Sequence, residues 1–153
     1  MIFKTEGFAE LNDQLIQLAQ GFRTDLVMRN TAVKAAKRAM APVERDANAY
    51  APFDEDSTGP IHLRKTIRLE SRIPTSADRN SIMVSQSDVV IGVVSVKKSA
   101  VSLSQEFGNA TTAAQPYLRV SLERNRDEVV RILGEELGTL IPAYAKKLAK
   151  RKV

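Results

Sequence analysis

The chain has 153 residues, no cysteine and one histidine, and its formal net charge is +5. This length predicts a single domain, 1–153, that can bury an ordinary hydrophobic core. The lack of cysteine excludes disulfides, thiolate metal sites and cysteine nucleophiles.

The positive charge is concentrated near the C-terminus. The residues that supply it are Lys146, Lys147, Lys150, Arg151 and Lys152, and the rest of the chain is formally neutral. This pattern indicates a balanced body followed by a basic tail, 149–153. No stretch approaches the roughly 20 apolar residues that a membrane helix needs, so we expect no membrane partner.

The N-terminal part, 8–51, shows the apolar spacing of two helices. The first apolar face consists of Phe8, Leu11, Leu15, Leu18 and Phe22. The second consists of Leu26, Val33, Ala36, Met40, Val43 and Ala47. Thr24 or Asp25 can cap the second helix. We expect a kink or break at Pro42 and an end at Ala51, before Pro52, because proline removes a backbone donor and restricts its neighbour.

The middle part, 63–107, predicts an antiparallel sheet of about four strands. Apolar and polar residues alternate in 63–73, a second run begins at Ile82, and 101–107 alternate again. Residues 89–96 are apolar on both faces, as in a central strand covered by helices, and Gly92 there suggests close approach of another backbone.

The C-terminal part, 116–148, predicts one long helix with a kink at Pro142. Pro116 stands where a first helical residue is tolerated, directly after the loop 109–115. The expected fold is therefore α+β, with the antiparallel sheet packed by the N-terminal helices and by the long C-terminal helix.

The chain shows no recognisable catalytic or cofactor-binding pattern. His62 is the only histidine, and the seven glycines form no phosphate-binding loop. Asp54, Glu55 and Asp56 lack the spacing of a calcium loop and are typical of a solvated turn. We therefore expect no enzymatic activity, no catalytic residues, no cofactor and no metal.

Two blocks of sequence resemble a family of tailed-bacteriophage neck or minor tail components, the tail-completion or head-tail joining proteins. "AYAPFDEDSTGPIHLRKTI" is similar to the A-P-x-D-T-G-x-L-R-x-S-I signature, and "SQEFGNATTAAQPYLRVSLERN" is similar to a V-E-F-G-T block followed by Q-P-F-L-R-P-A-L. The first block carries a turn motif of Pro52, Asp56, Thr58, Gly59, Leu63 and Arg64. The second carries Glu106, Phe107, Gly108, Asn109, Pro116, Tyr117, Leu118 and Arg119.

The resemblance implies a noncatalytic virion protein that is assembled in the bacterial host cytoplasm. Such a protein forms a homo-oligomeric ring at the head-tail junction, and DNA passes through the channel of the ring. A hexamer is compatible with this position, although nothing in the residues counts subunits. The implied neighbours are the head-closure and the tail-terminator or tail-tube proteins. Ring symmetry requires heterologous contacts, in which one patch meets a different patch on the next subunit.

Within this resemblance, the second block is expected to form a subunit interface. We expect Phe107 to anchor a strand end in the core, Gly108 and Asn109 to reverse the chain, and 116–118 to pin the returning helix. An ion pair between Arg119 and Glu106 is possible within or between subunits. The spacer 109–115 would present a small-residue surface that is ordered only by neighbours.

Three other interpretations stay open. The block could be a strand-to-helix connection fixed by core packing alone. The protein could act as a tail cap or an assembly chaperone rather than a permanent ring. In a third interpretation it is a nonspecific nucleic-acid-binding module that uses the basic C-terminal tail.

Overall fold

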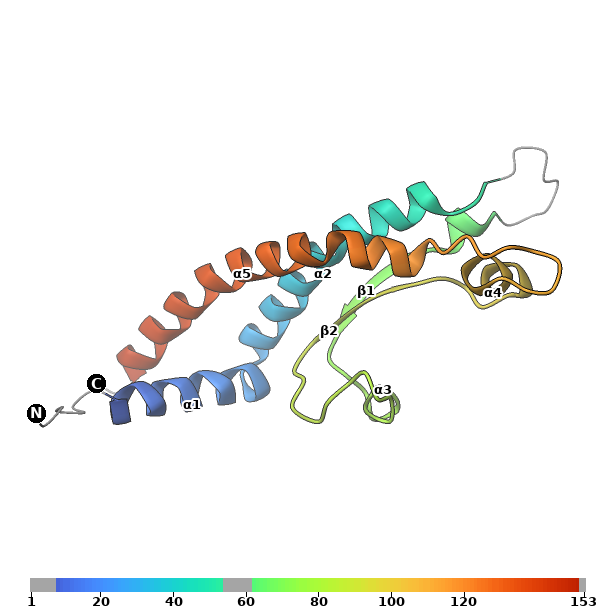
Figure 1. The fold of residues 1–153 in the computed structure, drawn as a ribbon. Helices are drawn as coiled ribbons and strands as arrows, with labels where there is room; N and C mark the ends of the chain where they lie inside the picture. The colour runs from blue at the N-terminus through green and yellow to red at the C-terminus, as the bar shows by residue number, and fades with distance from the viewer. Residues whose placement is uncertain (1–7, 54–61, 152–153) are drawn as a thin grey trace, which may run out of the picture.

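The computed structural model describes residues 8–53 and 62–151 (Figure 1). The elements are α1 (Phe8–Thr24), α2 (Leu26–Tyr50), the 3₁₀ turn η1 (Leu63–Thr66), β1 (Arg68–Arg72), α3 (Ser76–Arg79), β2 (Ile91–Ser95), α4 (Ala100–Phe107) and α5 (Leu118–Arg151). The protein is mainly helical. Among the described residues, no helix is long and apolar enough to cross a membrane.

Helices α2 and α5 form an antiparallel pair at the centre of the fold (Figure 1). Near the start of α2, Asp25 binds Lys147 at the far end of α5, with 3.3 Å between the charged atoms. Arg38 binds Glu136 at 3.0 Å, and Asp46 accepts a 2.7 Å hydrogen bond from Asn125. The partner on α5 moves back along the chain as the position on α2 advances, so the two helices lie side by side along most of α2.

The buried face of α2 is made mostly of small side chains. Its members are Met28, Ala32, Ala35, Ala39, Val43 and Ala47. Their spacing of three and four residues places them on one stripe, and alanine lets neighbouring backbones come close. The side chain of Asp25 caps the helix by accepting hydrogen bonds from the N–H groups of Val27 and Met28. The helix is continuous through Pro42, so the expected break is wrong.

Helix α1 contacts both α2 and α5, near the start of α2 and the end of α5 (Figure 1). A methyl group on Gly21 would overlap the phenol ring of Tyr144, so the absence of a side chain at Gly21 lets α5 lie against α1. Tyr144 is buried in this contact. The glycine therefore serves close packing between two helices.

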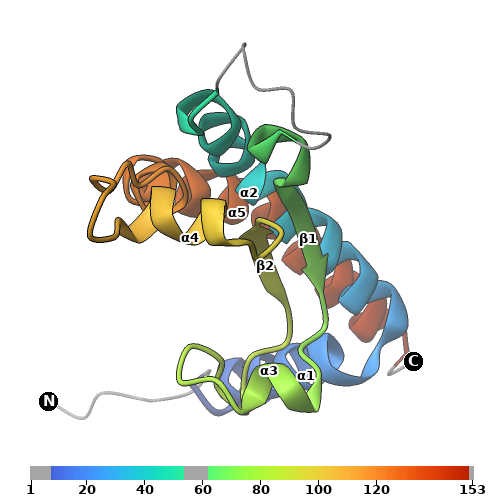
Figure 2. The same ribbon diagram turned by 90° about the vertical axis from the view of Figure 1, so that its right-hand side faces the viewer.

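The sheet has two antiparallel strands, in a register that pairs Arg68 with Ser95 and Arg72 with Ile91. Both strands contact α2. The close neighbour of Gly92 is a side chain and not the expected backbone, because a methyl group there would lie 2.8 Å from Cγ of Met40 and 3.5 Å from the carbonyl oxygen of Ala36. Figure 2 shows the hairpin with α4 at one end and α3 at the other.

The expected sheet of about four strands over 63–107 is wrong. Residues 63–66 form a 3₁₀ turn, 80–90 form turns and irregular backbone, and 100–107 form α4. Helix α4 is started by a capping box, in which Ser99 and Ser102 exchange side-chain and backbone hydrogen bonds. Three to four alternating residues fit a short helix as well as a strand, so these local hydrogen bonds decide the outcome.

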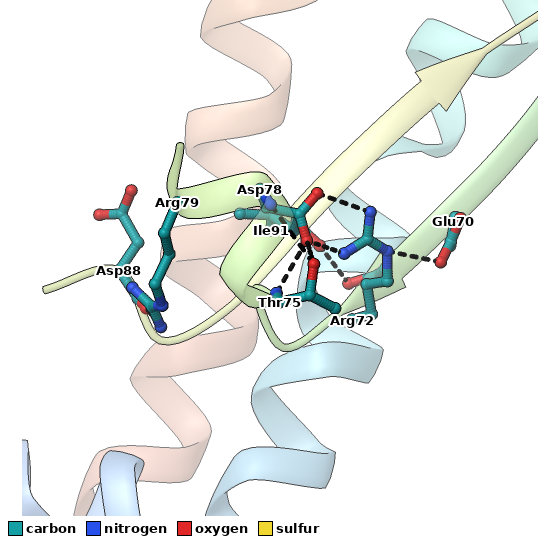
Figure 3. A network of polar contacts seen from close by, with 8 residues as sticks. Glu70, Arg72, Thr75, Asp78, Arg79, Asp88 and Ile91 are labelled. Atoms are coloured by element: carbon teal, nitrogen blue, oxygen red, sulfur yellow. Dashed lines mark hydrogen bonds and ion pairs between the residues drawn. The ribbon is translucent and has the colours of Figure 1, made fainter. Parts of the chain in front are cut away.

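A polar network fixes the connection between the strands (Figure 3). The guanidinium of Arg72 binds both carboxylate oxygens of Asp78, and it also binds Glu70 at 2.7 Å. The carboxylate of Asp78 accepts from the N–H and the hydroxyl of Thr75. The first of these bonds, together with the bond from the N–H of Asp78 to the Thr75 hydroxyl oxygen, forms the capping box of α3. The hydrogen bonds from Arg72, followed by those from Thr75, hold the pKa of Asp78 well below its usual range.

Candidate interface at the junction of α4 and α5

The residues of the second sequence block lie together where α4 ends and α5 begins. Glu106 is 6% exposed, and its carboxylate accepts three backbone hydrogen bonds from the start of α5. The N–H of Tyr117 donates at 2.9 Å, that of Leu118 at 3.0 Å and that of Arg119 at 3.1 Å. A helix has free N–H groups and a positive dipole end at its N-terminus, so a carboxylate is the matching cap. We call this arrangement the Glu106 cap.

Gly108 turns the chain between the two helices. Its φ of 75° lies in the left-handed region, and a methyl group there would meet the Ala114 backbone at 3.0 Å. The side chain of Asn109 then accepts hydrogen bonds from the N–H groups of Thr111 and Thr112, at 2.9 and 2.8 Å. The N–H of Gln115 donates to the carbonyl of Gln105 at 2.7 Å. The spacer 109–115 therefore carries its own hydrogen bonds, and the expectation that only neighbours order it is wrong.

Tyr117 is the anchor of this junction. It is fully buried and packs with Ala47, Ala51 and Ile67. Its hydroxyl has no hydrogen-bond partner within the described residues. Burial raises the pKa of this phenol, and the negative charge of Glu106 raises it further. Pro116 precedes Tyr117 and is half-buried at the start of the returning chain.

The roles expected for Phe107 and Arg119 need correction. Phe107 is 68% exposed and does not anchor anything in the core of this chain. In a helix, residues 106 and 107 point in directions about a quarter-turn apart, and the polar Glu106 takes the inward position. Arg119 contributes its backbone N–H to Glu106, and an ion pair between subunits stays a prediction.

Helix α4 has an inverted pattern of burial. Its buried side chains are Ser102 and Glu106, which are polar and four residues apart. Its apolar side chains Val101, Leu103 and Phe107 are exposed. Hydrogen bonds satisfy the two buried side chains, because Ser102 binds Ser99 and the carbonyl of Lys97, and Glu106 caps α5. Leu103 and Phe107 share one exposed flank of the helix, and Val101 lies on the opposite flank.

Leu103 and Phe107 border a groove with a volume of about 550 Å³, which we call the α4 groove. Its floor comes from β2 and α2, and its walls come from α4 and the first turns of α5. The walls are mainly apolar, and the lining includes Val94, Leu103, Phe107, Leu118 and Leu122. Lys98 and Arg119 add positive charge to the lining. The chemistry suits an uncharged, apolar occupant.

The turn motif of the first block is described only in part. Arg64 donates to the carbonyl of Ala51 at 2.9 Å and to that of Ala49 at 3.4 Å, and its guanidinium lies 4.9 Å from the ring centre of Phe53. A cation at the C-terminus of α2 matches the free carbonyls there. Leu63 packs against the buried cluster, and Pro52 follows the helix end. Asp56, Thr58 and Gly59 lie outside the described residues.

Comparisons with protein-family models, curated proteins and solved structures found no match. The site is therefore interpreted from its own geometry. In the described ranges, no three side chains of the metal-ligating types His, Cys, Asp and Glu converge. The ring of His62 lies 5.2 Å from that of Phe53.

The sequence interpretation missed one exposed apolar pair. Ile82 was expected to begin a strand, but it is 98% exposed, and Met83 beside it is 83% exposed. Both belong to the loop 80–87, which follows α3 and which we call the tip loop. The signal that could have found them is the short apolar run 82–84 between serine, asparagine and glutamine residues, because a strand needs a longer alternation.

Proposed function

We propose that this chain is a noncatalytic, ring-forming component of a tailed-phage virion that lies at the head-tail junction. The ring surrounds the channel through which DNA passes. Its neighbours are the head-closure and the tail-terminator or tail-tube proteins. The resemblance of two sequence blocks supports this assignment, and so does their placement, since the residues of the second block build one structural unit around the Glu106 cap.

The inverted burial of α4 is the observation that carries the proposal. Burial of an exposed aliphatic or aromatic side chain contributes about 1.5–3 kcal/mol. Val101, Leu103 and Phe107 forgo this contribution in the isolated chain, while the buried Ser102 and Glu106 of the same helix are hydrogen-bonded inside. Contiguous exposed apolar side chains mark surfaces that bind other proteins. A structural protein that works by contact with its neighbours needs such a surface.

Electron microscopy tests the proposal at two levels. Purified protein should form rings, and labelled protein should be found between head and tail in particles produced by the genome that carries the gene. Phe107→Ser should leave the fold intact, because the side chain is exposed, and should lower the yield of tailed particles. Val130→Ser is the matched control, since Val130 is similarly exposed on α5 and is not part of the groove lining.

One observation bears on the nucleic-acid alternative. Lys146 and Lys150 are exposed and lie four residues apart in α5, so they share one face of the helix, whereas Lys147 binds Asp25. The two exposed lysines are placed to contact phosphates. If they do, Lys146→Gln with Lys150→Gln should weaken binding to random-sequence DNA and flatten its dependence on salt. Unchanged binding would exclude this role for α5.

A further inference from the structure

The tip loop is an ordered support for two apolar side chains. The guanidinium of Arg79 donates to the carbonyls of Ser85, Gln86 and Asp88, at 2.7, 3.0 and 3.0 Å. The N–H of Ser85 donates to the carboxylate of Asp88 at 2.8 Å. The capping box of α3 and its bonds to Arg72 tie the start of the connection to β1 (Figure 3). These bonds hold the loop backbone while Ile82 and Met83 stay almost fully exposed.

The tip loop has the chemistry that the α4 groove accepts. None of the residues 80–87 is charged. The branched side chain of Ile82 and the unbranched side chain of Met83 offer apolar surface to the mainly apolar walls of the groove. The positive groups at Lys98 and Arg119 therefore meet no like charge from the loop. Serine, asparagine and glutamine side chains of the loop can accept hydrogen bonds from these two residues.

The loop and the groove face different parts of the molecule. Helix α3, which the tip loop follows, lies beyond one end of the strand pair, and α4 lies beside the other end (Figure 2). A loop at one end and its matching groove at the other give a head-to-tail contact. Such a contact between identical chains is heterologous, and repetition of it closes a ring or extends a filament.

We propose that the tip loop of one copy places Ile82 and Met83 in the α4 groove of the next copy. This inference rests on the proposed ring and specifies which two surfaces of the chain form it. Each subunit then uses its own tip loop on one side and its own groove on the other. The exposed side of α4 and the exposed apolar pair are covered by the same event.

The size of the contact predicts how assembly depends on concentration. Two inserted side chains cover far less than the roughly 1,200 Å² of total area found in stable interfaces. One contact alone is therefore short-lived, whereas a closed ring holds every subunit by two contacts. We expect monomers in dilute solution and rings at high concentration or on a preformed phage surface.

Cross-linking between two differently labelled chains tests the inference directly. The chain has no cysteine, so Met83→Cys protein and Leu103→Cys protein each carry a single thiol. Mixed at ring-forming concentration and treated with diamide as the oxidant, they should give a mixed disulfide dimer, because the thiols come within bonding distance. Met83→Cys mixed with Val130→Cys is the control and should give far less product. Equal yields from the two mixtures would overturn the inference.

A second measurement separates this inference from the proposed function. The double variant Ile82→Ser and Met83→Ser should raise the concentration needed for ring formation by about tenfold or more, with an unchanged circular dichroism spectrum. Rings that form equally well with this variant would overturn the tip-in-groove contact and leave the ring proposal standing. Wild-type protein that forms no rings and is absent from tailed particles would overturn both.

Discussion

Replacement of Glu106 by alanine tests the junction of α4 and α5. The change removes the acceptor of three N–H groups at the start of α5. Loss of a capping side chain costs about 0.5–2 kcal/mol, and one buried donor left unpaired costs about 1–3 kcal/mol more. The N–H of Tyr117 is the buried one, so the expected total is about 2–5 kcal/mol. This is a large part of the roughly 5–15 kcal/mol that stabilises a typical domain.

Urea unfolding followed by circular dichroism measures this loss. A cost near ~3 kcal/mol should also lower Tm by about 6–12 °C for a chain of this size. Glu106→Gln keeps one acceptor oxygen, which can serve Tyr117 and Leu118, but it loses the charge at the helix N-terminus and the acceptor for the N–H of Arg119. It should therefore cost less than Glu106→Ala, about 0.3–2 kcal/mol. Glu123→Ala is the control, because Glu123 is exposed on α5, the helix that Glu106 caps. If Glu106→Ala were as mild as Glu123→Ala, the cap would not stabilise the junction and our account of it would be refuted.

Further predictions concern glycine positions and titration. Gly134→Ala fills open space within α5 and should stabilise the fold by about 0.5–1 kcal/mol in urea unfolding, whereas Gly21→Ala strikes Tyr144 and should destabilise it by about 1–3 kcal/mol. Tyr117→Phe removes an unpaired buried hydroxyl, so stability should stay equal or rise by up to about 1–3 kcal/mol. Because burial raises the pKa of this phenol, the wild type should lose stability as pH rises above about 10, and the phenylalanine variant should lose less. Arg72 lowers the pKa of Asp78, so the stability that the Asp78 carboxylate contributes is lost as pH falls below about 4. Asp78→Asn should flatten that decline.

The helices were largely predictable from sequence because their signals are long and local. The extents of the apolar patterns in 8–22 and 26–47 correspond to α1 and α2, and Asp25 is one of the two caps expected. The face expected for α2 is wrong in part, because only Val43 and Ala47 of its members are buried and Leu26 is exposed. The long C-terminal helix begins two residues later than expected and continues to Arg151. The break expected as one alternative at Pro42 is absent, because packing of α2 against α5 and the sheet holds the helix together on both sides, whereas a kink there stays a prediction.

The sheet was not predictable to the same degree, because short alternating runs are ambiguous. Residues 101–107 alternate as a strand does, yet the hydrogen bonds between Ser99 and Ser102 begin a helix there. Residues 82–84 contain apolar side chains but no partner strand, and the backbone instead follows the bonds made by Arg79. In both places, side-chain bonds to nearby backbone outweighed the apolar pattern.

The candidate site was predictable in location but not in detail. The resemblance selected the residues that the structure gathers at the junction, including Gly108 with its positive φ. It assigned the anchor to Phe107, whereas Tyr117 and Glu106 occupy the interior. A strand model places alternate residues inside, and a helix model places residues four apart inside, so the error in secondary structure caused the error in the site.

The antiparallel pairing of α2 with α5 also governs when the protein can fold during its synthesis. The bonds between these helices join residues that are 74 to 122 positions apart. A ribosome therefore releases α2, with its alanine stripe uncovered, long before α5 exists to cover it. A nascent chain interrupted before α5 should stay unfolded and be degraded, so that only complete chains accumulate in the cell.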